Sequence, residues 1–284
     1  MNAKRFNLTA AGIFRQCAEV LRRQDANPFR VNAYLRAAET LETLKEDVRD
    51  ILTEEGIPGL IELPAIGRGL AASIDEIART GRLSQLDRLR GETTPEALFQ
   101  TVPGIGPQLA HELHETLHVD TLEALEVAAH DGRLASVSGI GERRAAGIRA
   151  GLAALLGRGS AKASARRAVP PVSVLLDVDR AYRQQSAADK LPKIAPKRFN
   201  PEGRAWLPIM HTNRGQWHFT VLFSNTARAH ELGRTDDWVV IYYYDDDHDE
   251  GQNTVVTETK GPLRGLRVVR GREAECRKLA AATG

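Results

Sequence analysis

The sequence predicts an α+β, multidomain protein, in which an all-α amino-terminal region precedes a smaller α+β domain with antiparallel strands. Three observations lead to this fold class. From Thr9 to about Leu156, apolar residues recur at helical spacing among Ala, Leu, Glu and Arg. Within that region, a segment centred on Ile-Gly occurs three times. After residue 171, several stretches carry the aromatic and β-branched residues that are typical of strands.

The first two helices are predicted from apolar faces and from the break between them. The stretch DANP ends one helix and starts the next, because Asn caps a helix and Pro suits its first turn. The first helix brings Ile13, Cys17, Val20 and Leu21 to one face, and the second brings Val31, Tyr34, Leu35 and Ala38 to one face.

Apolar periodicity is lost at GRGSAKASARRAVPP, which consists of small and basic residues and ends in two prolines. This composition indicates a flexible basic linker. We therefore expect a helical region over residues 1–156, the linker over 157–171, and an α+β domain over 172–284.

The carboxy-terminal domain begins with a predicted helix, SVLLDVDRAYRQQ, and continues with strands separated by short polar clusters. The acidic stretch YDDDHDEGQN is predicted to be a solvated hairpin loop. The predicted strands lie in GRAWLPIMHT, GQWHFTVLFS, DDWVVIYYYD and NTVVTETKG.

Composition excludes several functional classes. The net charge is only +2, so a surface that binds nucleic acid must be local rather than global. The two cysteines, Cys17 and Cys276, lie far apart without metal-type spacing, which favours a reducing compartment over a disulfide framework. The sequence shows no apolar run of membrane-spanning length and no apolar signal core at its start. We expect a cytoplasmic protein without a membrane partner.

The three repeats share an apolar residue, a turn of small residues around Ile-Gly, and a following helix. Glycine permits a very tight turn and lets another backbone approach closely. The second helix begins at the turn, so its N-terminal amides and its dipole are expected to attract a phosphate oxygen. The repeats are LPAIGRGLAASI (63–74), VPGIGPQLAHEL (102–113) and VSGIGERRAAGI (137–148).

This pattern resembles the helix-hairpin-helix motif, which binds the DNA backbone independently of base sequence. The alternative for a single copy is a tight corner between helices that has no ligand. Three copies with one apolar frame, and arginines beside two of the turns, favour the DNA-binding interpretation. The predicted DNA-binding residues of the turns are Gly67, Arg68, Gly104, Gly106, Gly139, Gly141, Arg143 and Arg144.

The stretches NPFRVNAYLRAAETL, LPAIGRGLAASIDEIARTGRL and VPGIGPQLA, in this order, resemble the amino-terminal region of family X DNA polymerases. The resemblance covers about residues 5–130 and implies binding of a 5′-phosphate in gapped DNA. It places Arg30 at a phosphate-binding lysine of the family and Tyr34 at the family's tyrosine. It also places Ser73 where some members have the lysine of a lyase. Because serine cannot form an imine, lyase chemistry is not expected.

The same resemblance implies a monovalent cation, Na⁺ or K⁺, held at the second hairpin by the backbone carbonyls of Gln100, Val102 and Ile105. It does not imply polymerase activity. The acids of LLDVDRAY, Asp177 and Asp179, follow no Gly-Ser phosphate site, and the chain after them is too short for palm and thumb. Asp177 and Asp179 are predicted instead to be exposed acids on a helix.

One arrangement in the carboxy-terminal domain suggests catalysis. Pairing of DDWVVIYYYD with NTVVTETKG brings Asp237, and Asp236 beside it, near Glu258 and Lys260. An aspartate beside Glu-x-Lys is typical of metal-dependent nucleases, where carboxylates hold Mg²⁺ and the lysine assists the water. The alternative is a solvated strand edge of alternating threonine and charge.

Near the end of the chain, GPLRGLRVVRGRE predicts a strand with one basic face. The hypotheses for this strand are a second DNA surface or an ordinary surface strand. Its arginines are Arg264, Arg267, Arg270 and Arg272.

The sequence therefore favours a DNA-binding protein that acts on gapped, nicked or branched DNA, in repair or recombination, with DNA and repair proteins as partners. One alternative is a nuclease that uses Mg²⁺ and the carboxy-terminal acids. The other is a scaffold whose hairpins hold a protein.

Overall fold

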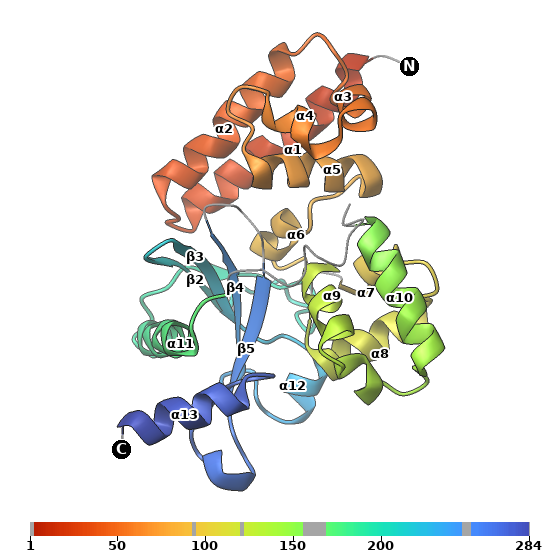
Figure 1. Ribbon diagram of the computed structural model, residues 1–284. Helices are drawn as coiled ribbons and strands as arrows, with labels where there is room; N and C mark the ends of the chain where they lie inside the picture. The colour runs from red at the N-terminus through yellow and green to blue at the C-terminus, as the bar shows by residue number, and fades with distance from the viewer. Residues whose placement is uncertain (1–2, 93–94, 120–121, 156–168, 246–250, 284) are drawn as a thin grey trace. The chain divides into compact units, whose positions relative to one another are not determined.

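The computed structural model describes residues 3–92, 95–119, 122–155, 169–245 and 251–283 (Figure 1). The chain divides into two compact units, of which unit 1 ends at Glu92 and unit 2 begins at Thr93. The α+β class is confirmed, because helices up to residue 155 precede a six-stranded antiparallel sheet. The predicted domain boundaries remain predictions, since residues 156–168 of the linker and 246–250 of the acidic loop lie outside the described residues.

Unit 1 is helical, and its core forms where the apolar faces of the first two helices meet. Phe14, Cys17 and Leu21 of α1 are fully buried, as is Leu41 of α2. The side chain of Asn27 caps α2 by accepting a hydrogen bond from the Phe29 amide at 2.9 Å, as the DANP break predicts. The helices are α1 (Ala3–Arg23), α2 (Pro28–Thr43), α3 (Val48–Glu54), α4 (Gly56–Ile61), α5 (Arg68–Thr80) and α6 (Ser84–Arg90).

Unit 2 begins with a second helical part, which has its own apolar core. Phe99, Leu113, Leu125 and Leu152 are fully buried at its centre. Its helices are α7 (Pro95–Phe99), α8 (Pro107–Leu117), α9 (Leu122–His130), the 3₁₀ helix η1 (Arg133–Ser136) and α10 (Glu142–Leu155).

The sheet of unit 2 is a meander in which each strand pairs antiparallel with the next, in the order β1 to β6. The five stretches predicted as strands from the sequence contain β2 to β6. The strands are β1 (Lys193–Ile194), β2 (Leu207–Arg214), β3 (Trp217–Phe223), β4 (Val239–Tyr244), β5 (Gly251–Thr257) and β6 (Arg267–Val269); the remaining helices are α11 (Val172–Ala187), α12 (Ala227–Glu231), η3 (Gly261–Leu263) and α13 (Glu273–Thr283).

Helix α11 lies against the sheet (Figure 1). Its Tyr182 is fully buried there. The Tyr182 hydroxyl donates a hydrogen bond to the Pro208 carbonyl at 2.8 Å and accepts one from the Phe223 amide at 3.0 Å. The prediction that α11 carries exposed acids is wrong for Asp179, whose exposed fraction is 1%. This carboxylate faces Arg267 of β6, and the guanidinium neutralises its charge inside the domain.

Candidate nucleic-acid interface

All three repeated segments fold as two helices joined by a short turn. The central isoleucines pack inward as expected: Ile66 and Ile105 are buried, and Ile140 packs against the core of unit 2. The first hairpin joins α4 to α5, the second joins α7 to α8, and the third joins η1 to α10.

The three turns have the same backbone hydrogen bonds. In the second turn, the amide of Ile105 donates to the carbonyl of Val102 at 3.1 Å, and the intervening Gly104 has a φ of 86°. A bond across three residues with a positive φ at the third position is characteristic of a type II turn. The equivalent bonds are Ile66 to Leu63 at 3.1 Å and Ile140 to Val137 at 3.3 Å, and the equivalent positive φ values are 60° at Ala65 and 78° at Gly139.

The second small residue of each turn is a glycine that the protein's own conformation does not require. The φ values of Gly67 and Gly106 are −81° and −84°, which any residue adopts. A Cβ added at Gly67, Gly106 or Gly141 would meet no heavy atom within 4 Å. Glycine at these places leaves the backbone of the turn open to a molecule that approaches from outside.

The helices after the first two turns begin without a side-chain cap. Gly67 is the N-cap of α5 and Gly106 is the N-cap of α8, and neither cap makes a side-chain hydrogen bond. The first amides of a helix have no acceptor within the helix, and the dipole places partial positive charge there. These helix ends consequently suit an anion such as a phosphate.

The predicted basic side chains of the turns are exposed. Arg68 follows the first turn, and Arg143 and Arg144 follow the third. The guanidinium of Arg144 donates a hydrogen bond to the Gly139 carbonyl at 3.4 Å, which holds it beside the turn. Each of these two hairpins therefore combines backbone amides with a cation.

In unit 1, the residues aligned with family X differ in their exposure to solvent. Arg30 is partly exposed in the first turn of α2, whereas Tyr34 is buried against the edge of Phe14 and its hydroxyl contacts Gln85. Tyr34 thus packs inside unit 1. The hydroxyl of Ser73 donates a hydrogen bond within α5, to the Gly69 carbonyl at 2.9 Å.

The carbonyls predicted to hold a monovalent cation lie at the second hairpin. The side chains of Val102 and Ile105 are buried, which fixes the backbone there, and Gln100 is exposed. The Val102 carbonyl accepts the Ile105 amide and retains a second lone pair, as every carbonyl does. Carbonyl oxygens are suitable ligands for Na⁺ or K⁺.

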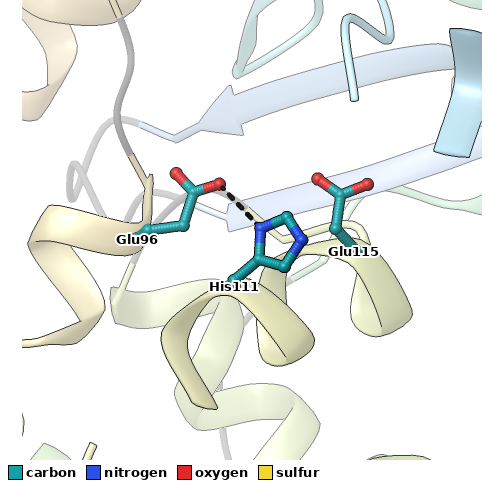
Figure 2. Close-up of side chains that lie close together, drawn as sticks. All are labelled: Glu96, His111 and Glu115. Carbon is teal, nitrogen blue, oxygen red and sulfur yellow. Dashed lines mark ion pairs between the residues drawn. The ribbon is translucent and has the colours of Figure 1, made fainter. Parts of the chain in front are cut away.

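The arrangement in the described residues that could hold a metal ion is one that the sequence reasoning missed. Glu96 of α7 faces His111 and Glu115 of α8, and one ligand atom of each lies within 4.8 Å of the others (Figure 2). His111 and Glu115 share a face because they are four residues apart in a helix. The spacing of His111 and Glu115 was the signal that the sequence offered for this cluster. Spacing could not include Glu96, because Glu96 lies on another helix, α7.

A guanidinium already lies at this cluster. Arg198, from the segment between β1 and β2, is 3.1 Å from the Glu96 carboxylate and 3.4 Å from that of Glu115. Burial raises the pKa of Glu96, but the hydrogen bond and charge of His114, together with Arg198, outweigh it and lower the pKa to about 2. A metal ion would have to compete with Arg198 for both carboxylates, so the cluster acts as an ion-pair network.

Strands β4 and β5 pair antiparallel as expected, and the Thr257 hydroxyl just before Glu258 contacts Asp237. Glu258 is the next residue along the chain, so its side chain points to the opposite face from Thr257 and Asp237. The carboxylates of the predicted nuclease residues Asp237 and Glu258 are engaged by different arginines. Asp237 accepts hydrogen bonds from Arg267 at 2.5 Å and from the Thr257 hydroxyl at 2.6 Å. Glu258 accepts one from Arg270 at 2.7 Å, and Lys260 is exposed. Binding of Mg²⁺ at these acids would require both arginines to leave.

The arginines of the last strand mostly contact the protein itself. Arg267 faces α11, Arg270 pairs with Glu258, and Arg272 pairs with Glu275 at 2.7 Å. Arg264 is exposed. Three of the four arginines that would form a continuous basic face are therefore held in ion pairs within the protein.

Comparison with protein families accounts for the three hairpins. Residues 6–83 match the family model of a helix-hairpin-helix domain, and residues 96–154 match a SAM-like helix-hairpin-helix tandem. The first hairpin lies in the first match and the other two lie in the tandem. Helix-hairpin-helix domains are typical of DNA-binding proteins. A search of curated proteins found no match. Within the described ranges, no helix has both the length and the apolar composition of a membrane span.

Proposed function

We propose that this protein binds DNA without reading its base sequence, prefers gapped, nicked or branched DNA, and acts in DNA repair or recombination. The observation that carries the proposal is the repeated turn. It has a type II geometry, an open glycine and, in the first two copies, an uncapped helix end. A phosphate oxygen fits such a turn through backbone amides and the helix dipole. Contacts of this kind fix a position on DNA without specifying bases.

The preference for interrupted DNA is supported by two further features. About residues 5–130 resemble the amino-terminal region of family X polymerases, which implies contact with a 5′-phosphate in a gap, here through Arg30 and Arg68. The hairpins also belong to two compact units, so one protein would offer two separate sets of phosphate-binding turns. A strand interruption bends at low cost, which favours simultaneous contact by both sets.

A monovalent cation is part of the proposal. The carbonyls of Gln100, Val102 and Ile105 would hold Na⁺ or K⁺ at the second hairpin, where Pro107 contributes no amide to the helix end. The cation would supply positive charge that this turn lacks, because arginine follows the first and third turns only.

The test is to measure binding to matched gapped, nicked and intact duplexes over a range of salt concentrations. We expect the tightest binding to gapped or nicked DNA and a steep loss of affinity with salt, because phosphate contacts release counterions. Gly67→Leu and Gly106→Leu in one chain should weaken binding to every duplex by at least about tenfold, since they obstruct the turns without straining φ.

The matched control is Gly12→Leu with Gly147→Leu. A Cβ at either position also meets no neighbour within 4 Å, but both glycines lie inside helices rather than at a turn. The control should bind like the unchanged protein. Failure of the unchanged protein to bind DNA at low salt would overturn the proposal. A protein partner retained after nuclease digestion, with DNA affinity unaffected by the leucines, would favour the scaffold hypothesis.

A further inference from the structure

Phe199 is an apolar side chain that the fold leaves in an unusual state. It lies between β1 and β2, its exposed fraction is 49%, and its φ is 53°. A left-handed backbone is rare for a bulky residue and costs free energy. Neither burial nor backbone preference explains a phenylalanine here.

The ring of Phe199 is nevertheless held in place. The His230 ring lies 4.4 Å from it, tilted by 41°, and the Arg198 guanidinium lies 5.3 Å from its centroid. Asn225 joins both supports, because its amide donates to the Arg198 carbonyl at 3.1 Å and its oxygen is 2.6 Å from His230 Nε2. A ring fixed in this way loses little conformational entropy when it binds.

The same segment is attached to the second hairpin within unit 2. Arg198 pairs with Glu96 of α7 and with Glu115 of α8, the two helices of that hairpin. The segment also carries the exposed cations Lys197 and Arg204, before and after Phe199 in the sequence, and Arg204 pairs with Glu202 at 2.6 Å. An aromatic face flanked by positive charge has the chemistry of a surface that binds single-stranded nucleic acid.

We propose that Phe199 stacks on an unpaired nucleobase at the interruption of a gapped duplex. The inference rests on the proposed function and adds a specific contact to it. Bases inside a continuous duplex are stacked on both faces, whereas a base in a gap offers one face to an aromatic side chain. The exposed Lys197, two residues before Phe199, suits a phosphate next to that base.

The experiment compares the full-length protein with Phe199→Gly and Phe199→Trp. Glycine removes the ring and tolerates the positive φ, so this variant should fold. We expect Phe199→Gly to bind gapped DNA about tenfold more weakly, with unchanged affinity for intact duplex. Phe199→Trp should keep the affinity for gapped DNA. The matched control is Leu266→Gly, because Leu266 is similarly exposed, at 47%.

A second readout uses 2-aminopurine as the unpaired base in the gap. Its fluorescence should decrease on binding to the unchanged protein and to Phe199→Trp, but not to Phe199→Gly. Binding of gapped DNA by Phe199→Gly with unchanged affinity and unchanged quenching would overturn the inference and leave the proposed function intact. Equal weakening for gapped and intact DNA would also overturn it. If the unchanged protein bound no DNA, the proposed function itself would fail.

Discussion

The hairpin turns and the acids of the sheet domain differ in how far the protein itself uses their polar groups. At the turns, Gly67 and Gly106 provide no side-chain cap, and the space beside their backbone is open. In the sheet domain, Asp237 and Glu258 are each bound by an arginine of the same domain. From residue types alone, the sequence favoured the hairpins as a binding site and kept the acids as an alternative site. The contacts in the structure distinguish the two regions. A polar group that already has a hydrogen-bond or ion-pair partner inside the fold is less available to a ligand.

The largest expected effect tests the structural role of the acids. Arg267 joins the buried Asp179 to Asp237, so Arg267→Met leaves a buried carboxylate without its main partner. We expect the free energy of unfolding of unit 2 to fall by about 3–5 kcal/mol. Urea unfolding followed by tryptophan fluorescence measures it, because all three tryptophans lie after residue 200.

The control for this variant is Arg270→Met, which breaks the ion pair with Glu258. The Arg270 side chain is 40% exposed, so the loss should be no more than about 1 kcal/mol. A similar small loss for both variants would show that the Asp179 pair contributes no more than a surface pair. In that case, the acids would again be candidates for metal binding.

Local patterns in the sequence predicted much of the fold. The strands β2 to β5 follow from β-branched and aromatic runs, and the hairpins follow from a turn written three times. The ion-pair partners could not be predicted in the same way. Asp179 and Arg267 are 88 positions apart, and Glu115 and Arg198 are 83 apart. Which acid meets which arginine depends on the packing of whole elements, and helical periodicity around Asp179 gives no sign of it.

The network at the second hairpin gives the next largest effect. The pKa of Glu96 is lowered from 4.5 to about 2, so the carboxylate stabilises the fold above pH 4.5, and this contribution is lost as the pH falls through about 2. We expect Glu96→Gln to lower the free energy of unfolding of unit 2 at pH 7 on the order of 3 kcal/mol. It should also flatten the loss of stability between pH 4.5 and 2.

Urea unfolding at pH 7, 4.5 and 3 measures this pH dependence. Glu112→Gln is the matched control, because Glu112 lies on the same helix, α8, as Glu115 and is partly exposed. It should leave both the stability and its pH dependence almost unchanged. If Glu96→Gln followed the same pH curve as the unchanged protein, Arg198 and His114 would not select the ionised form of Glu96.

The smallest expected effect compares the first hairpin with the second. Ala65 and Gly104 occupy the same place in their turns, with φ values of 60° and 86°. The left-handed backbone costs a residue with a Cβ roughly 1–2 kcal/mol of conformational free energy. For glycine this cost is smaller, but glycine loses more conformational entropy on folding. Gly104→Ala should therefore destabilise unit 2 by about 1 kcal/mol, and Ala65→Gly should stabilise unit 1 by about 0.5 kcal/mol.

Opposite signs at equivalent positions would attribute the effect to the turn conformation, because a Cβ at Gly104 meets no neighbour within 4 Å. Tryptophan fluorescence reports the stability of unit 2. Hydrogen exchange of the Ala71 amide, which bonds to the Gly67 carbonyl at 2.9 Å, reports the first hairpin. Faster exchange in Ala65→Gly would contradict the comparison. It would mean that the alanine methyl group makes a stabilising contribution at the first turn that exceeds the cost of its backbone conformation.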